Sequence, residues 1–585
     1  MTATLDRFRA IWVLDFEFTG GEGDNPSPVC LIAREWRSRQ LIRRWRDELH
    51  SAPFPLDSHT LFVAYYASAE WSCFLALGWP LPPCCIDLYA EFRCFTNNRF
   101  TQGSSLLGAL TYFGLPGITS NEKADMRTLI LSGGPWTPEQ QRGILGYCQT
   151  DVDATAALLT AMVKRKALDV SRALLRGRYT QAVATMETRG IPLDVETLAR
   201  LREQGDAIQA RLIEQVDQDY DVFEGGSFRL ERFGRYLTRR GIPWPRLPSG
   251  ALALDDDTFK EQARAYPELV PLRELRVSLG QLRLNRLAVG HDGRNRCLLS
   301  PFSSVTGRNQ PSNARFIFGP ATWMRSLIKP PPGYGVAYLD WGQQEFGIAA
   351  ALSGDIRMMA AYRSGDPYLA FAQQAGAVPA DATKLSHKAE RDRFKACVLA
   401  TQYGMGAEAL ALRINQPPIY ARQLLELHRR TYAQFWRWSD AVENTALLKQ
   451  HLWTVYGWRV HYGPGSIKIN PRSIRNFPMQ ANGAEMLRLA CILAMDAGIE
   501  LCAPIHDAIL IQAPLDVLDV RIADMQAIMR EASEKVLPGF PLASDAVIVR
   551  HPGRYRDERG AAMWANVWAL LCGEPEIRQA GCHSV

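Results

Sequence analysis

The chain has 585 residues, of which 47% are hydrophobic and 22% are charged, a balance typical of soluble globular proteins with several domains. This composition excludes a fibrous or an intrinsically disordered protein. The formal net charge of +6 is too small to identify a nucleic-acid-binding protein, although segments such as REWRSRQLIRRWR and RYLTRRG concentrate cations locally.

The twelve cysteines indicate free thiols in a reducing compartment. They lack the paired CxxC spacing of a zinc site, and Cys84 and Cys85 are neighbours, which does not suit a disulfide framework. The start MTATLDRFRAIWVLD has no apolar run long enough for a secretion signal, and no run of about 18 apolar residues follows it. We therefore expect a soluble cytoplasmic protein.

Residues 1 to about 165 alternate strand-like and helix-like patterns, as in an α/β domain. In the strand pattern IWVLDFEF, Asp15 and Glu17 point to the same face, where they could share a metal ion. In GYCQTDVDAT, Tyr147 and Asp151 are one helical turn apart and lie on one side of a helix. An ordinary solvated strand explains the first pair equally well, and the second pair favours a metal site.

The region from about 170 to 298 is expected to be helical. Two long amphipathic patterns, near 194–218 and 267–289, bracket a stretch rich in Pro, Gly and Arg that contains GIPWPRLPSG. These patterns predict paired helices with a loop-rich tip.

Two later segments each place an aspartate at the end of an apolar strand pattern. Asp340 lies in VAYLDWGQQEF, and Asp507 lies in APIHDAILI. A buried carboxylate without a compensating charge is costly, so two of them need a cation. If the two strands are neighbours, the aspartates can hold a pair of Mg²⁺ ions about 4 Å apart, as phosphoryl transfer requires. Either aspartate alone would more often be a turn or cap residue.

The run RDRFKACVLATQYG restricts the chemistry most tightly. Arg391, Lys395, Leu399 and Tyr403 recur every fourth residue and therefore share one face of a helix. This face suits a nucleoside triphosphate, because the two cations can neutralise phosphates while the ring packs near the base or sugar. An isolated Arg-x-x-x-Lys pair would more often be a solvated surface, and the two aspartates reverse that preference.

In their order and spacing, these three segments resemble the polymerase motifs of family A DNA polymerases, the class of bacterial DNA polymerase I. The matching residues, in motif order, are Asp340, Gln343 and Glu345; Arg391, Lys395, Tyr403 and Gly404; and His506 and Asp507. By this resemblance Asp340 and Asp507 are the metal ligands, helped by the backbone carbonyl of Trp341.

The resemblance also implies roles around the incoming dNTP. Arg391 and Lys395 would grip the triphosphate, and Lys395 would donate a proton to pyrophosphate. Tyr403 and Glu345 would border the sugar, where Glu345 excludes a 2′-hydroxyl and so selects deoxynucleotides. The implied dNTP-binding residues are Arg391, Lys395, Leu399, Tyr403, Glu345 and Gln343.

Further segments match the parts of this family that contact primer and template. The implied residues are Thr306, Arg308, Arg325, Arg472, Asn476, Gln480 and His506. Contacts of this kind position a duplex without reading its sequence. Taken singly, each arginine would more often be an ordinary surface or salt-bridge residue.

The two amino-terminal pairs resemble the 3′-to-5′ proofreading exonucleases that accompany these polymerases. The resemblance makes Asp15, Glu17 and Asp151 the metal ligands and Tyr147 the residue that orients the attacking water. Glu70, in VAYYASAEWSCF, takes the place of a fourth catalytic acid that is usually aspartate. Because Mg²⁺ has strict geometric demands and glutamate reaches further, we expect this activity to be weakened.

The expected fold is multidomain, with α/β and α+β parts. A ribonuclease H-like exonuclease domain would occupy 1–165, followed by a right-hand polymerase. Its thumb would cover 170–298, its palm 299–355 and 466–585, and its fingers 356–465. This layout resembles that of phage members of the family and predicts no 5′ nuclease domain. By this resemblance the protein would act in a bacterial cell, or as a phage protein in the cytoplasm of its host.

Two positions depart from the family pattern. Ala508 stands where many relatives carry a glutamate, which removes an acid beside the metals but spares the two principal ligands. Leu399 stands where relatives often carry Phe or Tyr, and we expect it to alter discrimination against dideoxynucleotides.

The implied function is template-directed DNA synthesis with proofreading, using two Mg²⁺ ions per active site, for which Mn²⁺ could substitute. The expected partners are primer-template DNA and dNTPs, with a monomeric enzyme that could join a replisome or processivity partner. Three alternatives remain: a single-subunit RNA polymerase of the same fold, a scaffold that binds primer ends, and an exonuclease whose carboxy-terminal region only binds DNA. Glu345 and the nuclease module argue against the RNA polymerase.

Overall fold

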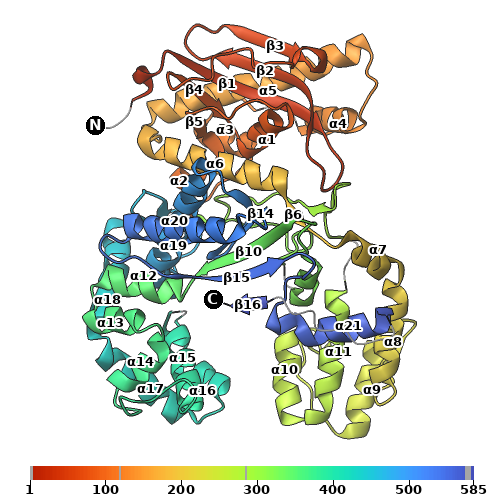
Figure 1. The fold of residues 1–585 in the computed structure, drawn as a ribbon, viewed down its shortest axis with the longest axis vertical. Coiled ribbons are helices and arrows are strands. Elements are labelled where there is room, and N and C mark those ends of the chain that lie inside the picture. Colours follow the sequence, from red (N-terminus) through yellow and green to blue (C-terminus); the bar gives the residue numbers. More distant parts are fainter. Residues whose placement is uncertain are drawn as a thin grey trace.

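The computed structural model describes residues 4–117, 120–282, 286–319, 321–402, 404–572 and 582–584. The molecule is mixed α/β, with two separate five-stranded sheets and helical lobes around them (Figure 1). Among the described residues, no helix has both the length and the apolar character that a bilayer crossing demands.

The N-terminal domain is built on a mixed sheet with strand order β3-β2-β1-β4-β5. Its strands are β1 (Ala10–Thr19), β2 (Ser27–Glu35), β3 (Leu41–Trp45), β4 (Thr60–Ala64) and β5 (Cys85–Asp87). Alternate residues of β1 enter different cores, because Ile11 and Val13 pack with α5 (Pro138–Lys164) while Trp12 and Leu14 pack with α1 (Ser68–Ala76). Asp15 and Glu17 continue the face that α5 covers.

Helix α6 (Val170–Arg189) joins this domain to the rest of the molecule. It contacts α1 and β5 on one side, and α19 (Pro471–Asp496) and β13 (Glu500–Ile505) on the other. Arg176 of α6 donates two hydrogen bonds to Glu91 of α2 (Leu88–Thr96), at 2.5 and 2.7 Å, and both side chains are buried. The expected thumb begins at residue 170, whereas the helical lobe itself begins after α6.

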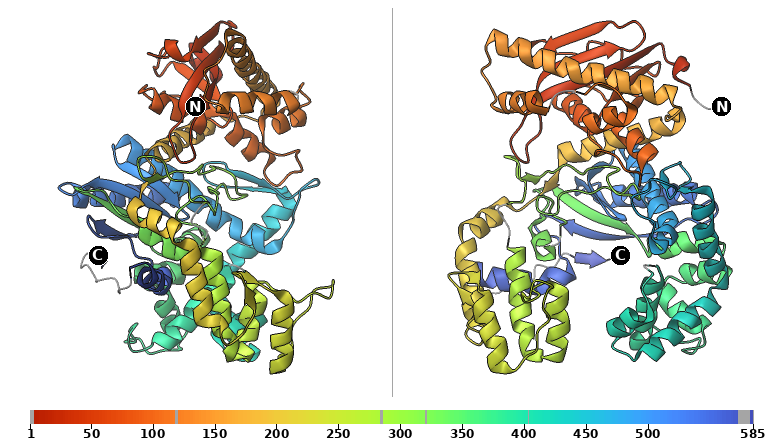
Figure 2. Two further views of the ribbon diagram at one scale, coloured as in Figure 1. Left: turned by 90° about the vertical axis from the view of Figure 1, so that its right-hand side faces the viewer. Right: turned by 180° about the vertical axis from the view of Figure 1, so that it is seen from behind.

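That lobe lies below the second sheet, and α21, the last described helix, also belongs to it (Figures 1 and 2). Its helices are α7 (Val195–Glu203), α8 (Gly205–Asp217), α9 (Leu230–Arg240), α10 (Asp256–Ala265) and α11 (Val270–Gln281). Helix α21 (Ala561–Cys572) packs against α8, so the two halves of the sequence meet in this lobe.

The second sheet is antiparallel in all its pairs, with strand order β13-β14-β10-β15-β16. Its remaining strands are β10 (Tyr334–Trp341), β14 (Ala508–Pro514), β15 (Ser544–Arg550) and β16 (Cys582–Ser584). Helices α19 and α20 (Leu518–Val536) cover one face, where buried Trp341 donates a hydrogen bond to the Met529 carbonyl oxygen at 3.2 Å. Because strand residues alternate, Tyr338 and Asp340 point to the opposite face.

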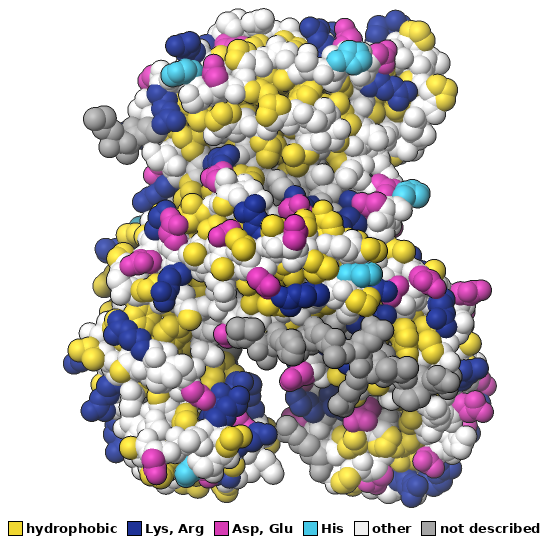
Figure 3. Space-filling view, in the orientation of Figure 1, with side chains coloured by type: hydrophobic (Ala, Val, Ile, Leu, Met, Phe, Trp, Pro, Cys, Tyr) yellow, Lys and Arg dark blue, Asp and Glu magenta, His cyan; other side chains and the backbone are white. Residues whose placement is uncertain are grey.

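A second helical lobe lies opposite the first, across an opening below the sheet. Its helices are α12 (Gln344–Ser353), α13 (Ile356–Arg363), α14 (Pro367–Gln374), α15 (Lys388–Gln402), α16 (Ala407–Ile414), α17 (Pro418–Thr431) and α18 (Ala433–Lys449). Figure 3 shows this opening as a hollow with Lys and Arg side chains gathered along the edge of this lobe.

Shorter elements complete the described chain. They are α3 (Leu106–Phe113), α4 (Ser120–Leu131), β6 (Ile191–Pro192), β7 (Phe223–Glu224), β8 (Ser227–Phe228), β9 (Arg294–Asn295), β11 (His451–Trp453) and β12 (Arg459–His461).

Candidate active site

The sheet brings Asp340 and Asp507 together. Asp507 lies in the two-residue turn between β13 and β14, and its carbonyl oxygen accepts a hydrogen bond from the Trp341 backbone at 3.3 Å. Partial burial raises the pKa of Asp340 to about 6, and the nearby charges of Asp507 and Asp545 contribute. Mutually repelling carboxylates of this kind could hold a divalent cation.

Asp545 was not predicted from the sequence. It lies on β15, directly opposite Asp340 in the strand register. The segment SDAVIVR contains one ordinary acid at the start of a strand, and only the pairing of β10 with β15 reveals its position.

The cationic face of α15 also has partners that the sequence did not reveal. Arg391 forms an ion pair with Asp366 at 2.5 Å, and Asp366 also caps the start of α14. The Tyr368 ring lies 5.5 Å from the Arg391 guanidinium carbon and 5.6 Å from the Lys395 nitrogen. The ring therefore holds the two cations side by side.

The other two residues expected on that face are Leu399 and Tyr403. Leu399 lies one turn beyond Lys395 on α15 and is half-buried. Tyr403, expected to border the sugar, lies outside the described residues.

Arg308 links two parts of the predicted site. Its guanidinium contacts the Glu345 carboxylate at 3.3 Å, near the start of α12. Burial and the positive charge of Arg308 lower the pKa of His506, which precedes Asp507 in the turn. Gln343 stands just before α12 with a φ of 46°, in the left-handed region. Glu345, which is expected to border the sugar, and Arg308, which is expected to contact primer or template, are therefore neighbours.

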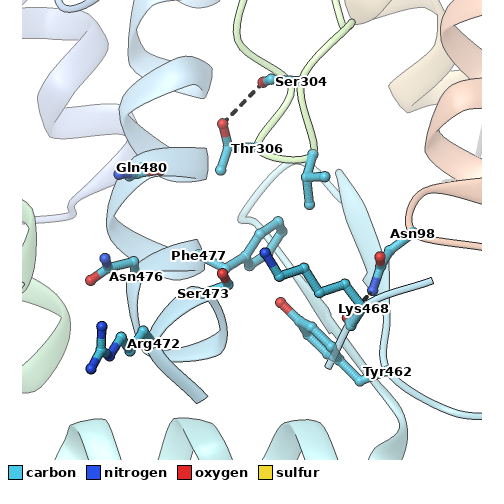
Figure 4. Close-up of a pocket in the computed structure, with 11 residues that line it drawn as sticks. Asn98, Ser304, Thr306, Tyr462, Lys468, Arg472, Ser473, Asn476, Phe477 and Gln480 are labelled. Atoms are coloured by element: carbon cyan, nitrogen blue, oxygen red, sulfur yellow. Dashed lines mark hydrogen bonds between the residues drawn. The ribbon is translucent and has the colours of Figure 1, made fainter. Parts of the chain in front are cut away.

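A cavity of about 420 Å³ collects several of the predicted DNA contacts (Figure 4). Arg472, Asn476 and Gln480 line it from successive turns of α19, and Thr306 lines it from a neighbouring loop. Asn98 of the N-terminal domain also lines it and donates hydrogen bonds to the carbonyl oxygens of His461 and Lys468. The further lining residues are Ser304, Val305, Tyr462, Lys468, Ser473 and Phe477.

Arg325 is engaged differently from the other predicted DNA contacts. Its guanidinium forms an ion pair with Asp557 at 2.6 Å and donates to the Phe318 carbonyl oxygen at 3.0 Å. Burial and the charges of Tyr555, Asp340 and Asp507 raise the pKa of Tyr338, which precedes Asp340 on the same face of β10, and the charge of Arg325 partly offsets this rise. Arg325 therefore lies near the two aspartates but is held by the carboxy-terminal segment.

The N-terminal domain gathers its own acidic site. Carboxylate oxygens of Asp15 and Glu17 and the sulfur of Cys148 lie within 4.8 Å of one another and could hold a metal ion. Cys148, on α5, was not predicted, and its thiol donates to the Asp15 carboxylate at 3.4 Å. Burial and the charges of Asp151, Glu17 and Asp15 raise the pKa of Tyr147, so all four predicted residues lie close together.

Glu70, on α1, lies beside this cluster. Its buried carboxylate accepts a hydrogen bond from the Phe16 backbone at 2.8 Å. Burial, Asp15 and Glu17 raise its pKa well above the usual value. A cavity of about 370 Å³ opens beside Asp15 and Asp151, and three tyrosines, Tyr65, Tyr66 and Tyr89, also line it.

Comparison with known proteins places these sites in context. Residues 317–548 match the family model described as DNA polymerase family A. The chain is 22% identical to DNA polymerase I of Aquifex aeolicus over 64% of this chain and 66% of that protein. It is 25% identical to the DNA polymerase of Mycobacterium phage L5 over 63% of this chain and 62% of that protein. The matched region thus spans less than two thirds of each of these relatives.

A solved structure shares the fold over nearly the whole chain. It is the POL domain of Pol1 from M. smegmatis in complex with DNA primer-template and dNTP. The TM-score is 0.70 at 17% identity, and the likeness covers 93% of this chain and 95% of that chain.

Proposed function

Because the chain carries a DNA polymerase family A domain over residues 317–548, we propose that it is a template-directed DNA polymerase that extends a primer with dNTPs. The observation that carries this proposal is the meeting of Asp340 and Asp507 on the open face of the second sheet, between two helical lobes. The arginine and lysine of α15 lie on one of those lobes, as phosphoryl transfer from a triphosphate requires.

In the proposed reaction the primer 3′-oxygen attacks the α-phosphate of a dNTP. Asp340, Asp507 and the Trp341 carbonyl would hold two Mg²⁺ ions, which activate the attacking oxygen and stabilise the leaving one when bound. Arg391 and Lys395 would neutralise the triphosphate, and Lys395 would give a proton to pyrophosphate.

Other residues of the site would select and position the substrates. Glu345, held by Arg308, would border the sugar and exclude a 2′-hydroxyl. Leu399, Gln343 and Tyr403 would complete the dNTP site. Contacts to primer and template would come from Thr306, Arg308, Arg325, Arg472, Asn476, Gln480 and His506.

A second activity, 3′-to-5′ exonucleolytic proofreading, is proposed for the N-terminal domain. It is favoured by the clustering of Asp15, Glu17, Tyr147 and Asp151 beside a cavity. Asp15, Glu17 and Asp151 would hold the metal ions, and Tyr147 would orient the attacking water. Glu70, whose carboxylate accepts a hydrogen bond from the Phe16 backbone, would be the fourth acid of this site.

Primer extension on a labelled DNA duplex tests both activities in one gel. Asp507→Asn should abolish extension with dNTPs and leave degradation of the primer intact. Asp15→Ala should abolish degradation and leave extension intact. A parallel reaction with rNTPs separates DNA synthesis from RNA synthesis. Extension that survives Asp507→Asn, or wild-type extension that prefers rNTPs, would overturn the proposal.

A further inference from the structure

Asp340 lies on the central strand of its sheet, so it has a direct neighbour on each side. The register pairs it with Ala508 on β14 and with Asp545 on β15. Residues directly opposite in adjacent strands project from the same face of a sheet. The side chains of all three residues therefore emerge on the open face, beside the Asp507 turn.

Ala508 leaves one of the two flanking positions without charge. This is the position where the family pattern leads one to expect a glutamate, and here its side chain is a buried methyl group. Asp545 occupies the equivalent position on the other neighbouring strand. The strand β14 therefore offers no acid beside Asp340, whereas β15 offers Asp545.

The Asp545 carboxylate lies beside the turn that follows Trp341. One of its carboxylate oxygens lies 3.7 Å from the place where a side-chain carbon on Gly342 would stand, in the turn that follows Trp341. Within the described ranges, Asp545 forms no ion pair with a Lys or Arg side chain, and the residue is exposed. Two like charges directly opposite in a sheet are destabilising unless a cation lies between them.

We propose that Asp545 is a third carboxylate of the polymerase cation site, supplying from β15 the negative charge that Ala508 omits on β14. This inference rests on the proposed function, because it assumes that Asp340 and Asp507 bind divalent ions. Three carboxylates around one face favour Mg²⁺ and Mn²⁺, which bind oxygen ligands.

Binding of Mn²⁺, followed by electron paramagnetic resonance, tests the inference without relying on catalysis. Every protein should carry Asp15→Ala and Glu17→Ala, so that the N-terminal acidic site does not contribute and DNA is not degraded. In this background Asp545→Asn should weaken Mn²⁺ binding by about tenfold in the presence of primer-template DNA. The matched control is Asp516→Asn, an exposed acid beyond the far end of β14, which should leave Mn²⁺ affinity unchanged.

A compensating variant tests whether the two flanking positions are equivalent. Adding Ala508→Glu to Asp545→Asn should restore Mn²⁺ affinity to within about threefold of the starting protein. The concentration of Mg²⁺ that gives half-maximal primer extension should rise in Asp545→Asn and fall again when Ala508→Glu is added. Without divalent ions, the melting temperature of Asp545→Asn should equal or exceed that of the starting protein, because one of two facing charges is removed.

The outcomes separate this inference from the proposed function. Mn²⁺ affinity that changes less than twofold in Asp545→Asn overturns the inference, even if the enzyme extends primers. Weakened binding that Ala508→Glu does not restore overturns the equivalence of the two positions. A wild-type protein that fails to extend primers refutes the proposed function, whereas loss of Mn²⁺ affinity in Asp545→Asn would still support a three-acid site.

Discussion

At the scale of single residues, Glu187 of α6 is an unusual acid. It is half-buried beside a cavity and accepts a hydrogen bond from the Leu299 backbone at 2.6 Å. Burial raises its pKa to about 8, so the folded protein keeps the carboxyl group protonated at neutral pH. The unfolded chain ionises near pH 4.5, so stability falls as the pH rises from about 4.5 to 8.

Glu187→Gln should remove this pH dependence, because the amide keeps an acceptor for Leu299 and carries no charge. The free energy of unfolding should rise by about 1 to 3 kcal/mol at pH 8 and above, and change little below pH 5. Denaturant unfolding of both proteins between pH 4.5 and 9 measures the difference. If the free energies of unfolding of the two proteins vary with pH in parallel, the raised pKa of Glu187 is refuted.

Glu345 offers a second test at the residue scale. Its contact with Arg308 fixes the carboxylate where it would border the nucleotide sugar. Glu345→Ala removes this obstacle, so the efficiency of rNTP incorporation relative to dNTP should rise at least tenfold. Single-nucleotide extension kinetics measure the ratio. Glu408→Ala, an exposed acid of the same lobe paired with Arg422, is the control and should leave the ratio unchanged.

At the scale of elements, the contact of α6 with β5 depends on a glycine. A side-chain carbon on Gly177 would lie 2.0 Å from the Cys85 carbonyl oxygen, so even a methyl group forces the helix and the strand apart. Gly177→Ala should cost on the order of 2 kcal/mol of unfolding free energy. Gly146 in α5 has open space around it, and Gly146→Ala should instead add up to about 1 kcal/mol. Thermal melting of the two variants should give shifts of opposite sign.

The strands and helices that carry chemistry could be predicted from local patterns. Apolar runs located β10 and β14, and the four-residue spacing located the cationic face of α15. The meeting of Asp340 with Asp507 followed from the resemblance to a family, and the strand pairing is consistent with it. The expectation of a mixed α/β fold like that of a polymerase domain is confirmed, and residues 317–548 match the model of DNA polymerase family A.

Contacts between distant segments could not be predicted from such patterns. Asp545 depends on the register of two strands far apart in sequence, and Tyr368 depends on how α14 packs against α15. Cys148 reaches the N-terminal site only because α5 lies across β1. In each case the residue type is common, and its position becomes informative only after folding.

At the scale of the whole molecule, we expect duplex DNA to bind in the opening between the two lobes. Neutralising phosphates with Lys and Arg releases counterions, so affinity for primer-template should fall steeply with salt. With about 6 to 10 phosphate contacts, the loss between 50 and 200 mM salt is about 10³ to 10⁵-fold. Fluorescence anisotropy across this range measures the slope, and a flat response would contradict a polymerase-like grip.

The position of α21 affects how firmly the lobe of helices α7 to α11 is attached to the rest of the molecule. The chain passes from α6 into this lobe at β6 and leaves it at the adjoining β9, and helix α21 then packs against α8. Arg554 fastens this third passage, with a 3.0 Å ion pair to Asp194 and its guanidinium 5.1 Å from the Trp564 ring. Three passages of the chain therefore attach this lobe to the rest of the molecule. We expect it to rotate less freely than a lobe that is joined by a single linker.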